Sequence, residues 1–147
     1  MKRYLYIFLL PLLLLNCKKE SEPAPLPAIE EIVGKWRLDA VEKTVNGQKV
    51  WEQVSGPVPI FTYYLVFRFD GVILGEKGLS WCCSPETLIV NGTSFKIKPK
   101  AKVPTNPQCA YVDCISCPSW DLEQRDNELI LTSACEFLNY RHRYLRE

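Results

Sequence analysis

The chain has 147 residues, with 18 basic and 17 acidic side chains and a formal net charge of +1. Its length suits one folded domain, and its balanced charge excludes a strong overall field that would attract nucleic acid. We therefore expect a single domain with no nucleic-acid partner.

Residues 1–16 are predicted to be a secretory signal peptide. Lys2 and Arg3 precede an apolar run from Leu5 to Leu15, which is shorter than the roughly 20 residues that span a bilayer. The run ends in the stretch LLLNC, which resembles the lipobox of bacterial lipoproteins. That resemblance implies cleavage before Cys17 and attachment of lipid to the Cys17 thiol.

Residues 17–28 are predicted to be a stalk that separates the membrane from the domain. They are polar and then proline-rich, with prolines at alternate positions from Pro23 to Pro27, and such a sequence stays extended without a core. Two or three acyl chains on Cys17 would hold the protein stably at a membrane. By resemblance to lipoprotein sorting signals, Lys18 implies the outer membrane. The domain is then residues 29–147.

Within the domain, apolar and polar residues alternate with the period of two that indicates strands with one buried face. Asp70-Gly71 and Asn91-Gly92 are expected to form hairpin turns. Eight or more short strands of this kind predict an all-β domain, a small antiparallel up-and-down barrel of about eight strands, with a β-sandwich as the alternative. We expect strands at residues 34–41, 63–69, 72–78, 86–90, 93–100, 109–114, 119–124, 128–133 and 137–147.

One strand is expected to carry a row of lysines. Lys96, Lys98, Lys100 and Lys102 occupy alternate positions. On a strand they would share one face, which we interpret as a solvated or edge-protecting face.

Six cysteines in an exported domain predict three disulfides. A bond between the adjacent Cys82 and Cys83 would be strained, which leaves twelve pairings open. The candidates are Cys82, Cys83, Cys109, Cys114, Cys117 and Cys135.

Cys114 and Cys117 also have the spacing of a redox pair or of half a zinc site. Pro118 disfavours the helix that follows a redox pair, and the adjacent Cys82 and Cys83 make a poor second half for a tetrahedral zinc site. We therefore expect disulfides and no metal.

The ends of the domain resemble a known family. Gly34 and Trp36 look like the Gly-x-Trp opening of the lipocalin superfamily, and the final RHRYLRE looks like its closing basic strand. With the lipobox, the stalk and a cysteine shortly before that strand, the chain is similar to the short lipocalin-like lipoproteins of Bacteroidetes-type bacteria. The resemblance implies a barrel in which Trp36 closes one end and either Arg143 or Arg146 lies across it.

Groups suited to catalysis are scarce. The only histidine, His142, falls inside a predicted strand, and the acidic residues are scattered singly. Catalysis needs a base, a nucleophile or a metal brought together, so we expect a binding protein rather than an enzyme, with no cofactor.

The resemblance implies that a small apolar or amphipathic ligand binds inside the barrel. The alternative is a protein-binding module, similar to periplasmic inhibitors of host hydrolases, that uses its loops or outer sheet face. It predicts a protruding loop at Cys82–Pro85 or Pro104–Pro118 that disulfides hold rigid. A third interpretation is an accessory part of a surface complex. The candidate cavity residues are Leu38, Tyr63, Leu65, Phe67 and Phe69, with Trp51 at the barrel mouth.

Overall fold

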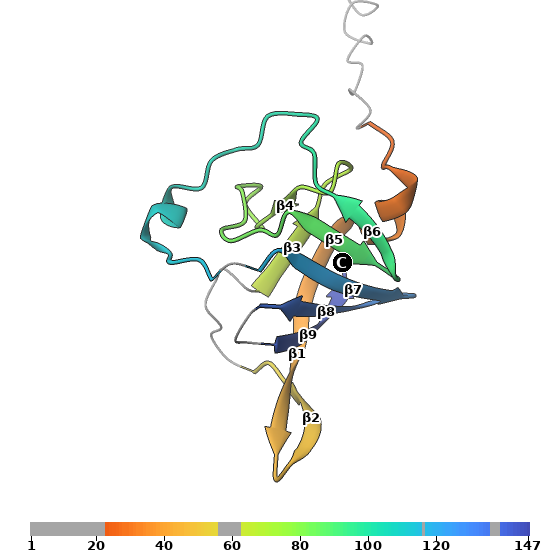
Figure 1. The fold of residues 1–147 in the computed structure, drawn as a ribbon, viewed down its shortest axis with the longest axis vertical. Coiled ribbons are helices and arrows are strands. Elements are labelled where there is room, and N and C mark those ends of the chain that lie inside the picture. The colour runs from red at the N-terminus through yellow and green to blue at the C-terminus, as the bar shows by residue number, and fades with distance from the viewer. Residues whose placement is uncertain (1–22, 56–62, 116, 136–138) are drawn as a thin grey trace, which may run out of the picture.

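The computed structural model describes residues 23–55, 63–115, 117–135 and 139–147, which Figure 1 draws as a coloured ribbon. The predicted signal peptide, the predicted lipidation residue Cys17 and the first part of the stalk lie outside the described residues. Among the described residues, no helix is long and apolar enough to span a bilayer.

Strands dominate the described part of the chain, and two short 3-10 helices accompany them. The prediction of an all-β domain is therefore confirmed. The elements are η1 (Pro27–Ile32), β1 (Gly34–Val45), β2 (Gln48–Gln53), β3 (Tyr64–Phe67), β4 (Ile73–Leu74), β5 (Thr87–Val90), β6 (Thr93–Lys96), η2 (Pro107–Tyr111), β7 (Ser119–Arg125), β8 (Glu128–Ala134) and β9 (Asn139–Arg146).

The strands form one strongly curled sheet, a half-barrel, as Figure 1 shows. Their order across the sheet is β4-β3-β1-β9-β8-β7-β5-β6, and β2 pairs with β1 beside this path. The pairs are antiparallel except for β5 and β7, which run parallel. The expected barrel-like fold is confirmed, and this one parallel pair departs from the expected up-and-down order.

Two-residue turns determine where the hairpins form. Asn91 and Gly92 have φ angles of 47° and 82°, the left-handed backbone that tight hairpins require, and they confirm the predicted turn between β5 and β6. Asn46 and Gly47 form a second such turn, with φ of 53° and 79°. The sequence prediction lacks this hairpin of β1 and β2, which protrudes from the sheet in Figure 1.

The strand predicted at residues 109–114 is wrong, because η2 occupies residues 107–111 and residues 112–114 form no strand. Pro107 supplies a fixed φ that suits the first position of a helical turn. The side chain of Asn106 accepts a hydrogen bond from the N–H of Gln108 at 3.1 Å, which caps the turn. Local capping therefore outweighs the alternation of apolar residues.

Two other predicted strands are shorter than expected. The strand predicted at 93–100 ends at Lys96, and the one predicted at 72–78 consists of Ile73 and Leu74 alone. Pro99 has no N–H to donate to a strand ladder. The four lysines from Lys96 to Lys102 therefore do not share one strand face.

The inner face of the half-barrel carries the hydrophobic core. Side chains at alternate positions of the strands meet there, and two isoleucines of η1 join them. This burial is the main stabilising term of the fold, at roughly 25 cal/mol per Å² of apolar surface. The core consists of Ile29, Ile32, Trp36, Leu38, Leu65, Phe67, Ile73, Leu88, Val90, Trp120, Leu122, Leu129, Leu131 and Tyr144.

A completely buried carboxylate, Asp70, lies in the turn between β3 and β4. Arg68 donates two hydrogen bonds to it, at 2.8 and 2.7 Å, and the N–H groups of Val72 and Lys100 donate at 3.4 and 2.7 Å. Burial acts to raise the pKa of Asp70, but these hydrogen bonds outweigh it and lower the pKa to about 2. Asp70 thus joins the turn to the segment that follows β6.

Candidate binding site between two disulfide-linked loops

The parallel pairing of β5 and β7 requires a long connection outside the sheet. Parallel neighbours cannot be joined by a tight turn, and here β6 and residues 97–118 carry the chain back to the start of β7. We call residues 97–118 the crossover loop. It contains η2 and extends away from the half-barrel in Figure 1.

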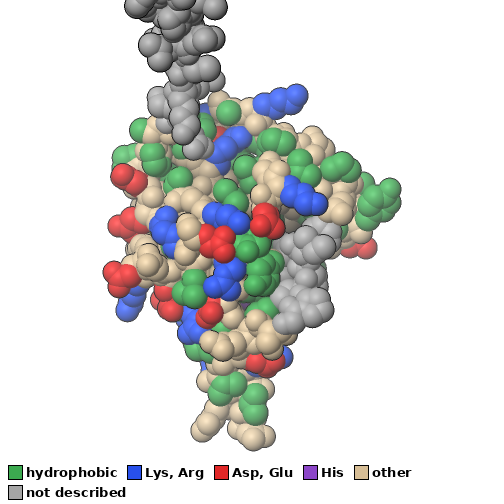
Figure 2. Space-filling model, turned by 180° about the vertical axis from the view of Figure 1, so that it is seen from behind, with side chains coloured by type: hydrophobic (Ala, Val, Ile, Leu, Met, Phe, Trp, Pro, Cys, Tyr) green, Lys and Arg blue, Asp and Glu red, His purple; other side chains and the backbone are tan. Residues whose placement is uncertain are grey.

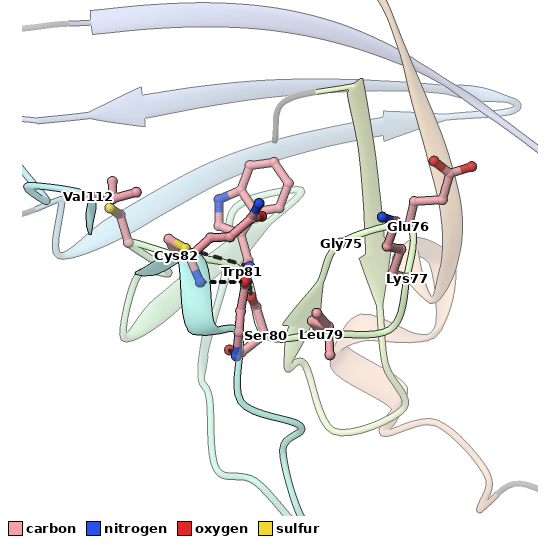
Figure 3. A pocket seen from close by; sticks show the side chains of 11 residues that line it. Gly75, Glu76, Lys77, Leu79, Ser80, Trp81, Cys82 and Val112 are labelled. Atoms are coloured by element: carbon pink, nitrogen blue, oxygen red, sulfur yellow. Dashed lines mark hydrogen bonds between the residues drawn. The ribbon is translucent and has the colours of Figure 1, made fainter. Parts of the chain in front are cut away.

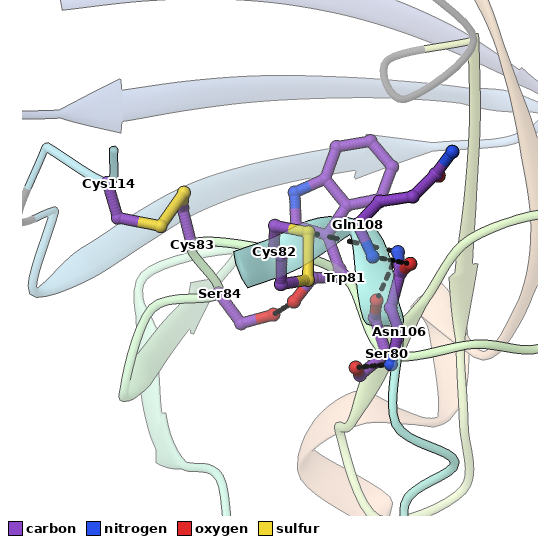
Figure 4. Close-up of a disulfide and its surroundings, with 9 residues drawn as sticks. Ser80, Trp81, Cys82, Cys83, Ser84, Asn106, Gln108 and Cys114 are labelled. Carbon is purple, nitrogen blue, oxygen red and sulfur yellow. Dashed lines mark hydrogen bonds between the residues drawn. A yellow bond between two sulfur atoms is a disulfide. The ribbon is translucent and has the colours of Figure 1, made fainter. Parts of the chain in front are cut away.

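Three disulfides fix the crossover loop. Cys82–Cys109 and Cys83–Cys114 attach it to residues 75–86, which we call the first loop, between β4 and β5. Figure 4 shows both bonds. The third, Cys117–Cys135, attaches the end of the crossover loop to the end of β8. The predicted set of three disulfides is confirmed, and Cys114 and Cys117 each bond a distant cysteine rather than each other.

Hydrogen bonds join the two loops beside the first of these disulfides. The N–H of Asn106 donates to the Ser80 hydroxyl at 3.1 Å, and the Asn106 amide donates to the Ser80 carbonyl at 3.2 Å. The N–H of Ser80 donates in turn to the carbonyl of Pro104 at 2.8 Å. Asn106 therefore fixes the spacing of the loops and also caps η2.

An open pocket of about 370 Å³ lies between the two loops. Figure 3 shows Trp81 and Cys82 in the middle of its lining, Val112 on one side, and Glu76, Lys77 and Leu79 on the other. Trp81 packs against the core, so core contacts hold its indole in position. The lining consists of Gly75, Glu76, Lys77, Leu79, Ser80, Trp81, Cys82, Cys83, Asn106, Gln108 and Val112.

Large apolar side chains are exposed on the crossover loop next to this pocket. Tyr111 is 92% exposed, Ile115 51% and Val112 39%. In Figure 2, which views the molecule from behind, hydrophobic side chains protrude on the side of the crossover loop. Exposed apolar groups that gather in this way mark interaction sites more often than single scattered ones do.

Of the five residues predicted to line a barrel cavity, three lie in the packed core, and none of the five lines the pocket between the loops. Leu38, Leu65 and Phe67 are at most 3% exposed and belong to the packed core. Phe69 is 7% exposed and follows the end of β3. Tyr63 is half-buried and meets the ring of Tyr64 edge-on.

Trp51, predicted at the barrel mouth, lies in strand β2. The guanidinium groups of Arg141 and Arg143 lie 5.6 and 5.5 Å from the centre of its ring, within the range of cation–π attraction. Arg143 pairs with Asp39 at 2.7 Å and Arg141 with Glu42 at 2.7 Å. Trp51 therefore belongs to a charged cluster on the sheet rather than to the loop pocket.

Of the two candidate arginines, Arg146 lies across Trp36. Its guanidinium is 4.2 Å from the centre of the Trp36 ring, and it donates to the carbonyls of Val33, at 2.9 Å, and Glu31. Trp36 is completely buried, and its indole donates to the carbonyl of Ile32 at 2.7 Å. A Cβ at Gly34, whose φ is +129°, would come within 3.2 Å of Arg146.

His142 stays among aromatic rings of β9. It stacks on Tyr140 at 6.1 Å and meets Tyr144 edge-on at 6.3 Å, measured between ring centres. Burial lowers the pKa of His142, which favours the neutral imidazole at neutral pH.

The pocket itself was not predicted, although the protein-binding alternative predicts a protruding loop at Cys82–Pro85 or at Pro104–Pro118. Adjacent cysteines such as Cys82 and Cys83 avoid bonding each other and take two different partners. An adjacent pair of cysteines therefore predicts that residues 82–83 lie close to another segment that contains cysteines. The role of Asn106 has no comparable signal, because it depends on which cysteines pair.

Comparisons with known proteins found no matching family model, no matching curated protein and no matching solved structure. The function of the chain is therefore inferred from its residues and geometry.

Proposed function

We propose that this protein is a membrane-anchored binding domain that recognises a partner protein through its two disulfide-linked loops. The observation that carries the proposal is Tyr111, which is 92% exposed in a segment that two disulfides hold beside an open pocket. Aromatic residues such as tyrosine contribute much of the binding energy at protein interfaces.

The pocket suits an apolar side chain of the partner. Leu79, Trp81 and Val112 give it apolar surfaces, and the amide of Gln108 adds a polar group to its lining. Its volume of about 370 Å³ is at the lower end of the range for ligand pockets. Because the disulfides already order the loops, less conformational entropy is lost on binding.

The anchor and the location are part of the same proposal. The lipobox resemblance supports lipid attachment at Cys17 and an outer-membrane position. The contact of Arg146 with Trp36 supports the resemblance to lipocalin-like lipoproteins. A small ligand inside the half-barrel has less support, because Leu38, Leu65 and Phe67 are packed in the core.

A displayed peptide library tests the binding site without knowledge of the partner. We expect the oxidised protein to select peptides with an aromatic or large aliphatic residue. Tyr111→Ala should weaken the selected peptides at least about tenfold, the loss typical of a central interface residue. Affinity is measured by fluorescence polarisation.

Tyr140→Ala is the matched control, since Tyr140 is also exposed, at 49%, but lies in strand β9 and does not line the pocket. It should leave the affinity unchanged. Peptides that bind the Tyr111→Ala variant as well as the original protein would contradict the proposal. So would a small molecule that copurifies with the oxidised protein and is lost on denaturation, because that result favours a carrier.

A further inference from the structure

The stalk, residues 17–28, enters the domain beside residues Lys96–Lys102, which we call the lysine segment. The N–H of Leu26 donates to the carbonyl of Phe69 at 3.3 Å, and the next residue, Asp70, accepts from the N–H of Lys100 at 2.7 Å. Figure 1 shows the chain after β6 and the start of the described stalk at the same end of the molecule. The β1–β2 hairpin lies at the opposite end.

Further hydrogen bonds fix the lysine segment in this position. Arg68 donates to the carbonyls of Ala101 and Lys102 at 3.1 and 3.0 Å, while it also binds Asp70. Pairing with Asp70 neutralises the charge of Arg68, so the lysines themselves carry the positive charge of the segment. Their backbone is held even though the segment is not a strand.

The charges of this segment face solvent. Lys96, Lys98, Lys100 and Lys102 are all exposed, and within the described ranges none of them has a carboxylate oxygen within 4.0 Å. The sequence has no acidic residue between Glu86 and Asp113. The segment is therefore a local positive region on a chain whose total charge is near zero.

The proposed anchor limits how far this end can lie from the membrane. Leu26 is nine positions after Cys17 in the chain, and even a fully extended chain of that length spans at most about 30 Å. A tether this short gives the lysine segment a high effective concentration at the lipid surface. A contact too weak to recruit a free protein can then persist.

We propose that the lysine segment, Lys96–Lys102, docks on anionic lipid headgroups and orients the domain on its membrane. This inference rests on the proposed lipid anchor. Each lysine near an anionic surface strengthens the contact about fivefold, and the contact weakens as salt screens it. The β1–β2 hairpin then points away from the membrane.

Lysine acetylation read by mass spectrometry tests the docking on the lipidated mature protein in vesicles. In vesicles with about one third phosphatidylglycerol, we expect acetylation of Lys96, Lys98, Lys100 and Lys102 to slow at least about fivefold relative to neutral phosphatidylcholine vesicles. High salt should restore the rate. Lys43 and Lys49 of the β1–β2 hairpin are internal controls and should react equally in both.

Variants separate docking from a general effect of charge. The triple variant Lys98→Gln, Lys100→Gln, Lys102→Gln should remove the protection of the remaining Lys96. The matched double variant Lys43→Gln, Lys49→Gln should leave Lys98 to Lys102 protected. Equal acetylation on both kinds of vesicle would overturn the docking.

The intact mass of the same sample distinguishes the two proposals. A mass that includes acyl chains, together with equal acetylation, overturns the docking alone. A mass without acyl chains overturns the anchor and, with it, the docking that rests on the anchor.

Discussion

The half-barrel and the pair of disulfide-linked loops are stabilised in different ways. In the half-barrel, residues such as Trp36, Leu65 and Leu122 are completely buried and strand ladders satisfy the backbone. In the loops, two disulfides and the bonds between Ser80 and Asn106 hold the chain. Covalent links do not require apolar burial, so the loops can leave apolar side chains exposed for binding.

The largest predicted effect is on the half-barrel. Trp36→Ala removes a completely buried ring, its hydrogen bond to Ile32 and the surface that Arg146 covers. We expect the free energy of unfolding to fall by about 4 kcal/mol, measured by denaturant unfolding of the oxidised protein. Trp51→Ala is the control and should cost under about 1.5 kcal/mol, because Trp51 is only half-buried. Equal losses would show that the core does not extend around Trp36.

The next effect concerns the buried Asp70. Asp70→Asn leaves the charge of Arg68 without its partner, and we expect a loss of about 3 kcal/mol in the free energy of unfolding at neutral pH. The carboxyl pKa is lowered from 3.8 to about 2. Its ionisation therefore contributes about 2 kcal/mol of stability above pH 4, which disappears as the pH falls through 2.

Unfolding measured from pH 2 to pH 6 checks this dependence. The original protein should lose that stability toward low pH, and Asp70→Asn should lose correspondingly less. The exposed Asp121 offers a control, and Asp121→Asn should follow the original protein. A variant at Asp70 with the same acid sensitivity as the original protein would contradict the assignment.

Disulfide removal compares the two regions directly. Cys117 and Cys135 adjoin the strands β7 and β8, so replacing both with serine leaves the native chain ordered and should cost about 3 kcal/mol through the unfolded state. Replacing Cys83 and Cys114 should cost only about 1 kcal/mol. Loss of the Cys83–Cys114 bond gives the unfolded chain conformational entropy worth about 3.5 kcal/mol. The native loops of this variant loosen as well, and their added entropy offsets much of that loss of stability.

Hydrogen exchange locates the loosening. In the Cys83, Cys114 variant, the amides of Ser80 and Asn106 should exchange faster, whereas those of Leu131 in β8 should not change. If the loop amides kept their protection and the full cost appeared in unfolding, the loops would hold their shape without that bond.

The smallest effect on stability is expected at the binding loop. Tyr111 is 92% exposed, so Tyr111→Ala should change the free energy of unfolding by less than about 0.5 kcal/mol, as measured by thermal unfolding. Combined with a loss of peptide binding, this result would separate recognition from folding. A destabilisation above about 1 kcal/mol would mean that Tyr111 packs on the protein.

The sequence predicted the features of the fold that depend on local pattern. The period of two identified the long strands and the burial of Trp36 and Leu65, and Asn91-Gly92 identified a turn. The Asn46-Gly47 hairpin was missed although its signal is of the same kind. The parallel pairing of β5 and β7 could not be predicted, because it depends on contacts between residues far apart in the chain.

The candidate site was less predictable than the fold. The even number of cysteines predicted three disulfides, but the pairing of Cys82 with Cys109 depends on the folded arrangement. The pocket exists only once that pairing is known. Asn106 illustrates the difficulty, since its effect on η2 is local whereas its bond to Ser80 is not.

The pairing of neighbouring cysteines has a consequence for proteolysis. Cys82 bonds Cys109, and Cys83 bonds Cys114. The six residues 109–114, together with Cys82 and Cys83, therefore form a covalent macrocycle that contains Tyr111. A protease that cuts one peptide bond between Cys109 and Cys114 adds a water molecule but releases no fragment, because both new ends remain attached. The binding segment would then remain covalently attached after cleavage, just as a cyclic peptide remains a single molecule after one cut.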